Sequence, residues 1–64
     1  MKHFLIEDFG TIVDCNNISE VPEKLGYKSR KEMIRDNGFV EPDIVELTDD
    51  EYAIELLYET YDVV

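Results

Sequence analysis

Cysteine, histidine and tryptophan are nearly absent from this 64-residue sequence, which holds one Cys, one His and no Trp. Because Cys15 is alone, no intrachain disulfide can form, and with only His3 beside it a closed Cys/His zinc site is excluded. Disulfides and zinc are common supports of short chains, which bury only about 60% of their unfolded surface. We therefore expect stability to come from the hydrophobic core, from a partner, or from both.

Long apolar runs are also missing. No stretch approaches the roughly 18 apolar residues of a membrane-spanning helix, and residues 1–6 are too short for the core of a signal peptide. A single unpaired Cys is typical of a reducing compartment, so we expect a cytoplasmic protein. Pro and Gly are scarce while apolar residues make up 44%, which predicts one folded domain over residues 1–64.

Positive charge is scarce, and five of the six bases lie in one segment. The chain has 16 Asp and Glu against 6 Lys and Arg, a net charge of -10. Residues 1–23 sum to -4, residues 24–40 sum to +3, and residues 41–64 hold nine acids and no base. The basic segment either contacts nucleic acid or pairs with the acidic last third, within the fold or between copies. Its five bases are Lys24, Lys28, Arg30, Lys31 and Arg35.

The pattern along the chain predicts an α+β fold. Residues 2–6 and the β-branched residues 11–13 predict two strands joined by a turn at Phe9-Gly10, an N-terminal hairpin. A short helix is expected over residues 19–26, because Pro22 suits a first turn and Gly26 a helix end.

A second helix is predicted after Ser29, which forms a capping box with Glu32. This helix would turn Met33 and Ile34 inward and end at Asn37-Gly38.

The last third predicts a strand over residues 43–47 and then an acidic helix from residue 49 to about 61. Thr48 and Glu51 form a second capping box, with acids where the helix dipole favours them. Residues 52–58 also alternate as a strand would, so a C-terminal hairpin of 43–47 with 52–58 is the alternative. On a helix, one side holds Ala53, Leu56, Leu57 and Thr60, flanked by Tyr52 and Tyr61, and the other holds Glu51, Glu55, Glu59 and Asp62 around Tyr58.

Catalytic constellations are sparse. His3 is the only side chain that could act as a base for Cys15, and there is no Gly-rich phosphate loop, nucleophile elbow or HExxH motif. Residues 49–51 lack the spaced Asp, Asn and Gly of a calcium loop, and helix capping explains them without a metal. We expect a protein that is not an enzyme and that needs no metal or cofactor.

The acidic last third predicts a protein-binding surface. On a helix, carboxylates four residues apart are about 6 Å apart along the axis, comparable to the charge spacing of a nucleic-acid backbone. In size and charge the chain resembles the small acidic inhibitors encoded by phages and mobile elements, some of which mimic DNA. That resemblance implies an anti-defence inhibitor that blocks the basic nucleic-acid-binding groove of another protein. The expected contact residues are Asp49, Asp50, Glu51, Glu55, Tyr58, Glu59 and Asp62.

The basic segment supports an alternative function. A short helix, a Gly-containing turn and a second helix resemble a helix-turn-helix, which implies a small DNA-binding regulator using Lys24, Lys28, Arg30, Lys31 and Arg35. Residues 25–31 are also similar to a short stretch in the N-terminal domain of phage antirepressors. A second alternative is a structural subunit, such as a homodimer, whose acidic and basic regions pair between copies.

Overall fold

The predicted N-terminal hairpin lies at the centre of the structure, a computed structural model that describes residues 1–58 and 61–64. Strand β1 (Lys2–Ile6) pairs antiparallel with β2 (Thr11–Cys15). The turn between them is a 3-10 helix, η1 (Glu7–Phe9), followed by Gly10 at φ 60°, a left-handed conformation that glycine adopts without strain. The hairpin is confirmed, and its second strand continues two residues beyond the expected end.

Two short strands extend the hairpin into a mixed sheet with the order β3-β1-β2-β4. Strand β3 (Val45–Leu47) pairs antiparallel with β1, which confirms the C-terminal part of the strand expected over residues 43–47. Strand β4 (Asp62–Val63) pairs parallel with β2 and had no counterpart in the sequence prediction. The N–H of Val64 donates to the carbonyl of Ile12 at 2.9 Å, so the end of the described chain is hydrogen-bonded to the sheet.

Short helices cover one face of the sheet. The 3-10 helix η2 (Ile18–Glu20) leads into α1 (Val21–Lys24), and a loop connects α1 to α2 (Arg30–Asp36). As predicted, the Ser29 hydroxyl accepts a hydrogen bond from the N–H of Glu32, at 3.2 Å. Met33 is buried at 1% exposure and Ile34 is half-buried, so α2 turns its expected side toward the core.

Helix α3 (Asp49–Tyr58) decides between the two predictions for the last third. Its capping box is complete, because the N–H of Glu51 donates to Thr48 Oγ1 at 3.1 Å and the N–H of Thr48 donates to Glu51 Oε1 at 2.9 Å. The C-terminal hairpin is therefore wrong for residues 52–58. The helix was expected to reach residue 61, but Tyr61 precedes β4 instead of continuing α3.

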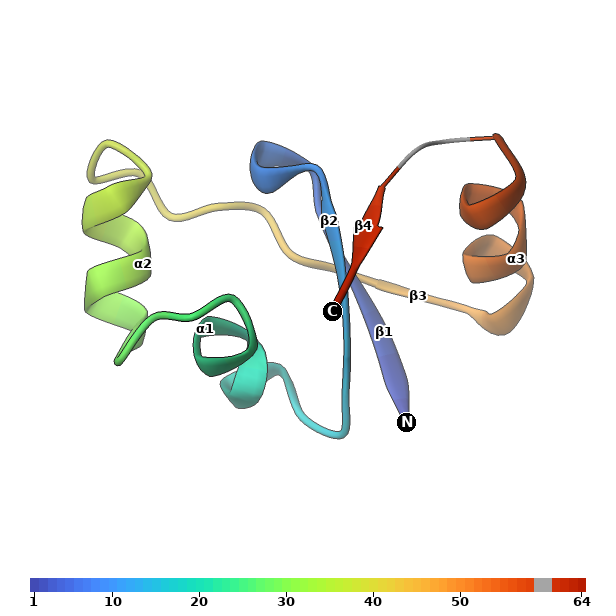
Figure 1. Ribbon diagram of the computed structural model, residues 1–64, viewed down its shortest axis with the longest axis horizontal. Helices are drawn as coiled ribbons and strands as arrows, with labels where there is room; N and C mark the ends of the chain where they lie inside the picture. Colours follow the sequence, from blue (N-terminus) through green and yellow to red (C-terminus); the bar gives the residue numbers. More distant parts are fainter. Residues whose placement is uncertain (59–60) are drawn as a thin grey trace.

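Successive side chains of each strand point to opposite faces of the sheet, so the core is divided into two clusters, one on each face. Figure 1 shows α1 and α2 on one side of the sheet and α3 on the other, so α2 and α3 lie at opposite ends of a molecule about 31 Å long. The α1/α2 side holds the larger cluster: Phe4, Ile6, Val13, Cys15, Val21 and Met33. The α3 side holds Leu5, Ile12 and Leu47, with Tyr52 and Tyr61 packed against them.

Candidate functional site

Helix α3 is attached to the domain mainly through Tyr52. The Tyr52 ring stacks on the His3 ring, with centroids 3.6 Å apart and planes within 8° of parallel. Its hydroxyl donates to Asp14 Oδ2 at 3.1 Å, while Asp14 Oδ1 lies 2.6 Å from His3 Nδ1. Burial raises the pKa of Tyr52, and the hydrogen bond with Asp14 raises that pKa further. These three side chains hold α3 in one orientation on the sheet.

This attachment was not anticipated from the sequence, although a signal for it was present. His3 and Asp14 are direct cross-strand partners in the hairpin, so their side chains lie on the same face of the sheet. A second strand that reaches Cys15 places this pair together. His3 therefore has a structural role, and Cys15, which faces the α1/α2 cluster, lies on the opposite face of the sheet.

The rest of α3 faces solvent. No residue of the helix is buried, and four large apolar side chains are exposed: Ile54 by 53%, Leu56 by 49%, Leu57 by 78% and Tyr58 by 79%. The apolar side expected from the periodicity is therefore not a core face, because Tyr52 alone among the described residues of α3 packs against the buried cluster. Thr60, also expected on that side, lies outside the described residues.

Five of the exposed residues of α3 lie on one side of the helix, away from Tyr52 and the sheet. At 100° per residue, Ile54, Leu57 and Tyr58 lie on the side of the helix opposite Tyr52. Asp50 and Glu51 lie in the same sector one turn earlier, so carboxylates adjoin the apolar side chains. We call Asp50, Glu51, Ile54, Leu57 and Tyr58 the α3 stripe.

The other expected acidic contacts are dispersed. Asp49 is exposed at the start of α3, whereas Glu55 is half-buried. Asp62 lies in β4 and not on the helix, so the row of carboxylates expected on one helix side is not continued by it. Glu59 lies outside the described residues. Among the described residues, Glu51 therefore belongs to the stripe and Asp62 does not.

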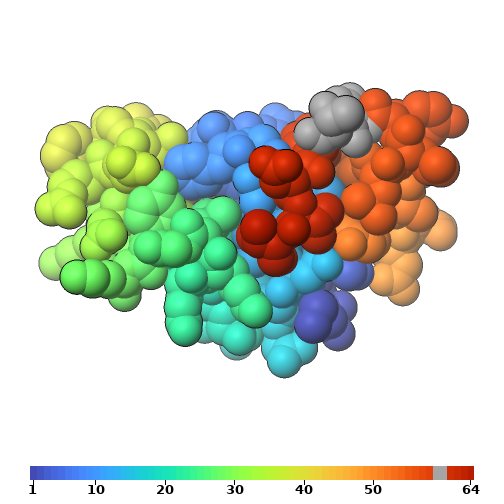
Figure 2. Space-filling view, in the orientation of Figure 1, coloured from blue at the N-terminus to red at the C-terminus, as the bar shows by residue number. Residues whose placement is uncertain are grey.

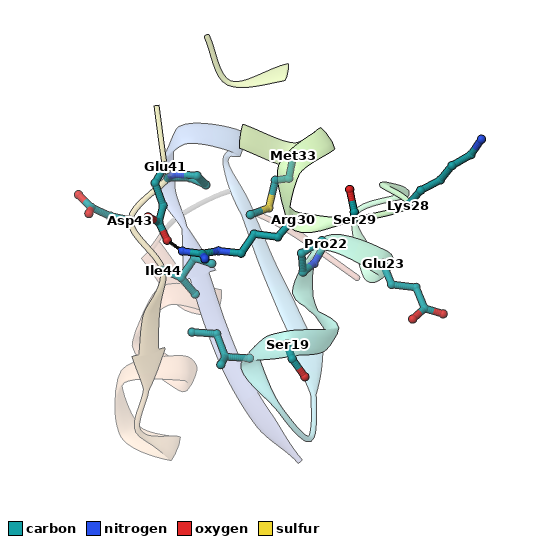
Figure 3. Close-up of a pocket in the computed structure, with 12 residues that line it drawn as sticks. Ser19, Pro22, Glu23, Lys28, Ser29, Arg30, Met33, Glu41, Asp43 and Ile44 are labelled. Carbon is teal, nitrogen blue, oxygen red and sulfur yellow. Dashed lines mark ion pairs between the residues drawn. The ribbon is translucent and has the colours of Figure 1, made fainter. Parts of the chain in front are cut away.

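The five bases lie at the other end of the molecule. All are exposed: Lys24 at the end of α1, Lys28 in the loop, and Arg30, Lys31 and Arg35 on α2. Arg30 forms an ion pair with Glu41 (Figure 3), the one ion pair among the described residues between the basic segment and the acidic last third. No ion pair joins the basic segment to α3 within the described chain. Figure 2 shows α2, which carries three of the five bases, and α3 at opposite ends.

Two depressions adjoin the basic segment, and neither was expected from the sequence. The larger, about 750 Å³, lies between η2, α1, the start of α2 and residues 41–44, and the Arg30–Glu41 ion pair lines it (Figure 3). The smaller, about 470 Å³, is lined by Ser29, by side chains of α2 and by Phe39. Phe39 is 78% exposed and has φ 63°, a conformation that is strained for a non-glycine residue. We call the residues of this smaller depression the α2 hollow: Ser29, Lys31, Glu32, Ile34, Arg35 and Phe39.

Burial raises the pKa of the Cys15 thiol, which donates to the carbonyl of Asn17 at 3.2 Å. Within residues 1–58 and 61–64, no three His, Cys, Asp or Glu side chains are placed to hold a metal ion. In that same part of the chain, no helix has the length and apolar character needed to cross a membrane.

Comparison with known proteins adds no family to this description. The sequence matches no family model, no curated protein and no solved structure.

Proposed function

We propose that this chain is an acidic protein-binding module that presents the α3 stripe to a basic, nucleic-acid-binding surface of another protein and thereby inhibits it. One observation carries the proposal: α3 is well capped and fixed in orientation by Tyr52, yet it turns three large apolar side chains and two carboxylates to solvent. A solvated helix of a small domain ordinarily exposes its polar side. An exposed apolar stripe on a fixed helix is typical of an interaction surface.

The spacing of the stripe supports a helix-in-groove mode of recognition. Ile54, Leu57 and Tyr58 occupy positions i, i+3 and i+4, which are the anchor positions of helices that bind apolar grooves. Tyr is favoured at binding hot spots, and its exposed ring is available here. The partner surface that complements this stripe is an apolar groove with Lys or Arg at its rim.

The charge of the α3 end favours a basic partner. Asp49, Asp50 and Glu51 are exposed in the first turn, and no base stands among residues 41–64. Such a surface attracts basic grooves at long range and repels nucleic acid, which supports competition with DNA for a third protein. The apolar anchors then contribute affinity, while the carboxylates contribute association rate and specificity.

The proposal is tested by capture and competition. The tagged protein is incubated with nuclease-treated bacterial lysate, and a captured nucleic-acid-binding protein is purified and titrated with labelled duplex DNA. We expect the chain to displace the duplex, and we expect Asp50→Asn/Glu51→Gln, which neutralises the two carboxylates of the stripe, to weaken displacement and flatten its salt dependence. Gln at position 51 preserves the capping box. Unchanged affinity of this double variant would contradict mimicry of a nucleic acid.

The exposed bases of α2 favour a second candidate, a DNA-binding regulator. Lys31 and Arg35 are exposed beside the aromatic ring of Phe39, a combination that suits nucleic-acid backbones and bases. Helix α1 has only four residues, shorter than the first helix of a helix-turn-helix is expected to be. A gel shift of labelled duplex at low salt that is abolished by Lys31→Gln/Arg35→Gln would support this function, and no shift would exclude it.

A further inference from the structure

We propose that the chain associates with itself head to tail, the α3 stripe of one copy seating in the α2 hollow of the next. This goes beyond the proposed function, because the partner is a second copy of the same chain. The two surfaces lie at opposite ends of the long axis, so one copy can use both at once (Figures 1 and 2).

Charge complementarity selects this pairing over the symmetric ones. A two-fold contact between two α3 stripes would place Asp50 and Glu51 against their own copies, with no base of residues 41–64 to neutralise them. A two-fold contact between two α2 hollows would bring four bases together with only the two copies of Glu32 to neutralise them. The contact of stripe with hollow instead sets the carboxylates of Asp50 and Glu51 against Lys31 and Arg35.

The exposed apolar side chains of the stripe also have apolar counterparts in the hollow. Leu57 and Tyr58 are 78% and 79% exposed on the stripe. The hollow offers the exposed Phe39 ring and the half-buried Ile34, within a volume of about 470 Å³ that accommodates one such side chain.

The net charge of -10 does not prevent such a contact at physiological salt. The Debye length is about 8 Å at 0.15 M, whereas the molecule is 31 Å long. Repulsion between the distant acidic regions is therefore screened, while charges in direct contact still attract. Copies joined head to tail cover their α3 stripes, so self-association competes with the binding of a target protein.

Complementation between two variants tests the proposal. The first, Leu57→Ala/Tyr58→Ala, disables the stripe, and the second, Lys31→Gln/Arg35→Gln, disables the hollow. All four side chains are exposed, so both variants keep the fold. Each is examined by sedimentation from ~10 µM to ~1 mM protein at 0.15 M salt, a range suited to weak association.

We expect the wild-type chain to form dimers and longer species as its concentration rises. Each variant alone should associate at least tenfold more weakly, and an equimolar mixture should form 1:1 dimers that do not grow, because one intact stripe and one intact hollow remain. A monomeric wild-type chain would overturn self-association and leave target binding unaffected. Association that persists in the hollow variant but not in the stripe variant would show a symmetric α3 contact and also overturn the proposal.

Discussion

The orientation of α3 depends on the Tyr52 hydroxyl, and removing that oxygen alone tests this dependence. In Tyr52→Phe the ring can still stack on His3, but the hydrogen bond to Asp14 is lost. The carboxylate of Asp14 keeps its contact with His3 Nδ1, so it is not left without a partner. The variant therefore isolates one hydrogen bond between α3 and the sheet.

The expected loss of folding free energy follows from the fact that this hydrogen bond is made to a charged carboxylate. Hydrogen bonds to charged groups contribute about 1.5–3 kcal/mol when buried. The Asp14 side chain is 22% exposed, so water compensates part of the loss, and we expect about 1 kcal/mol. Tyr52→Ala also removes the stacked ring and its packing against the small cluster. We expect that variant to cost about 2–3 kcal/mol.

Urea unfolding and amide hydrogen exchange measure these effects separately. Tyr52→Phe should lower the free energy of unfolding by about 1 kcal/mol and speed exchange in α3 more than in β1 and β2. Tyr58→Phe is the matched control, because the Tyr58 ring is 79% exposed and should leave stability unchanged. Equal stability of Tyr52→Phe and wild type, or uniform acceleration of exchange across the sheet, would refute the attachment described here.

Three further predictions concern the capping box of α3, the Tyr52 hydroxyl and the buried Cys15 thiol. Thr48→Ala removes one half of the capping box and should cost about 1 kcal/mol in urea unfolding, whereas Glu51→Gln should retain stability. The pKa of Tyr52 is higher in the folded chain, so the unfolded chain loses the hydroxyl proton first as the pH rises. The free energy of unfolding should therefore fall above about pH 10. A Tyr52→Phe variant whose free energy of unfolding falls as steeply over that range would contradict this. Cys15 is 2% exposed and burial raises its pKa, so a thiol reagent at pH 8 should label it only after unfolding, and rapid labelling of the native chain would contradict its burial.

Local signals predicted most of the fold because they act within a few residues. The capping boxes at Ser29 and Thr48 fix helix starts through bonds between neighbours, and both are present. Gly10 determines the hairpin turn in the same way. The choice between helix and strand for residues 52–58 was ambiguous by periodicity, since both patterns fit. The capping box at Thr48, not the apolar pattern, indicated the correct result.

Tertiary contacts account for what the sequence did not predict. The periodicity located an apolar side on α3 but could not show that Tyr52 is the residue of α3 that packs against the buried cluster, because that orientation depends on His3 and Asp14 from β1 and β2. Strand β4 is two residues long and forms by pairing with β2, which no local pattern indicates. Because no local pattern indicates β4, Asp62 was expected beside the acids of the helix. The α2 hollow also depends on tertiary contacts, and it was not predicted.

The central claim is that the α3 stripe is a protein-binding surface, and one titration tests it most directly. The affinity of the captured target is measured for the wild-type chain, for Leu57→Ala/Tyr58→Ala, and for Val40→Ala, which truncates an apolar side chain that is 62% exposed in the linker after α2. We predict at least a tenfold loss of affinity for the stripe variant and no change for the linker variant. Equal affinities of the stripe variant and the wild-type chain would contradict the claim.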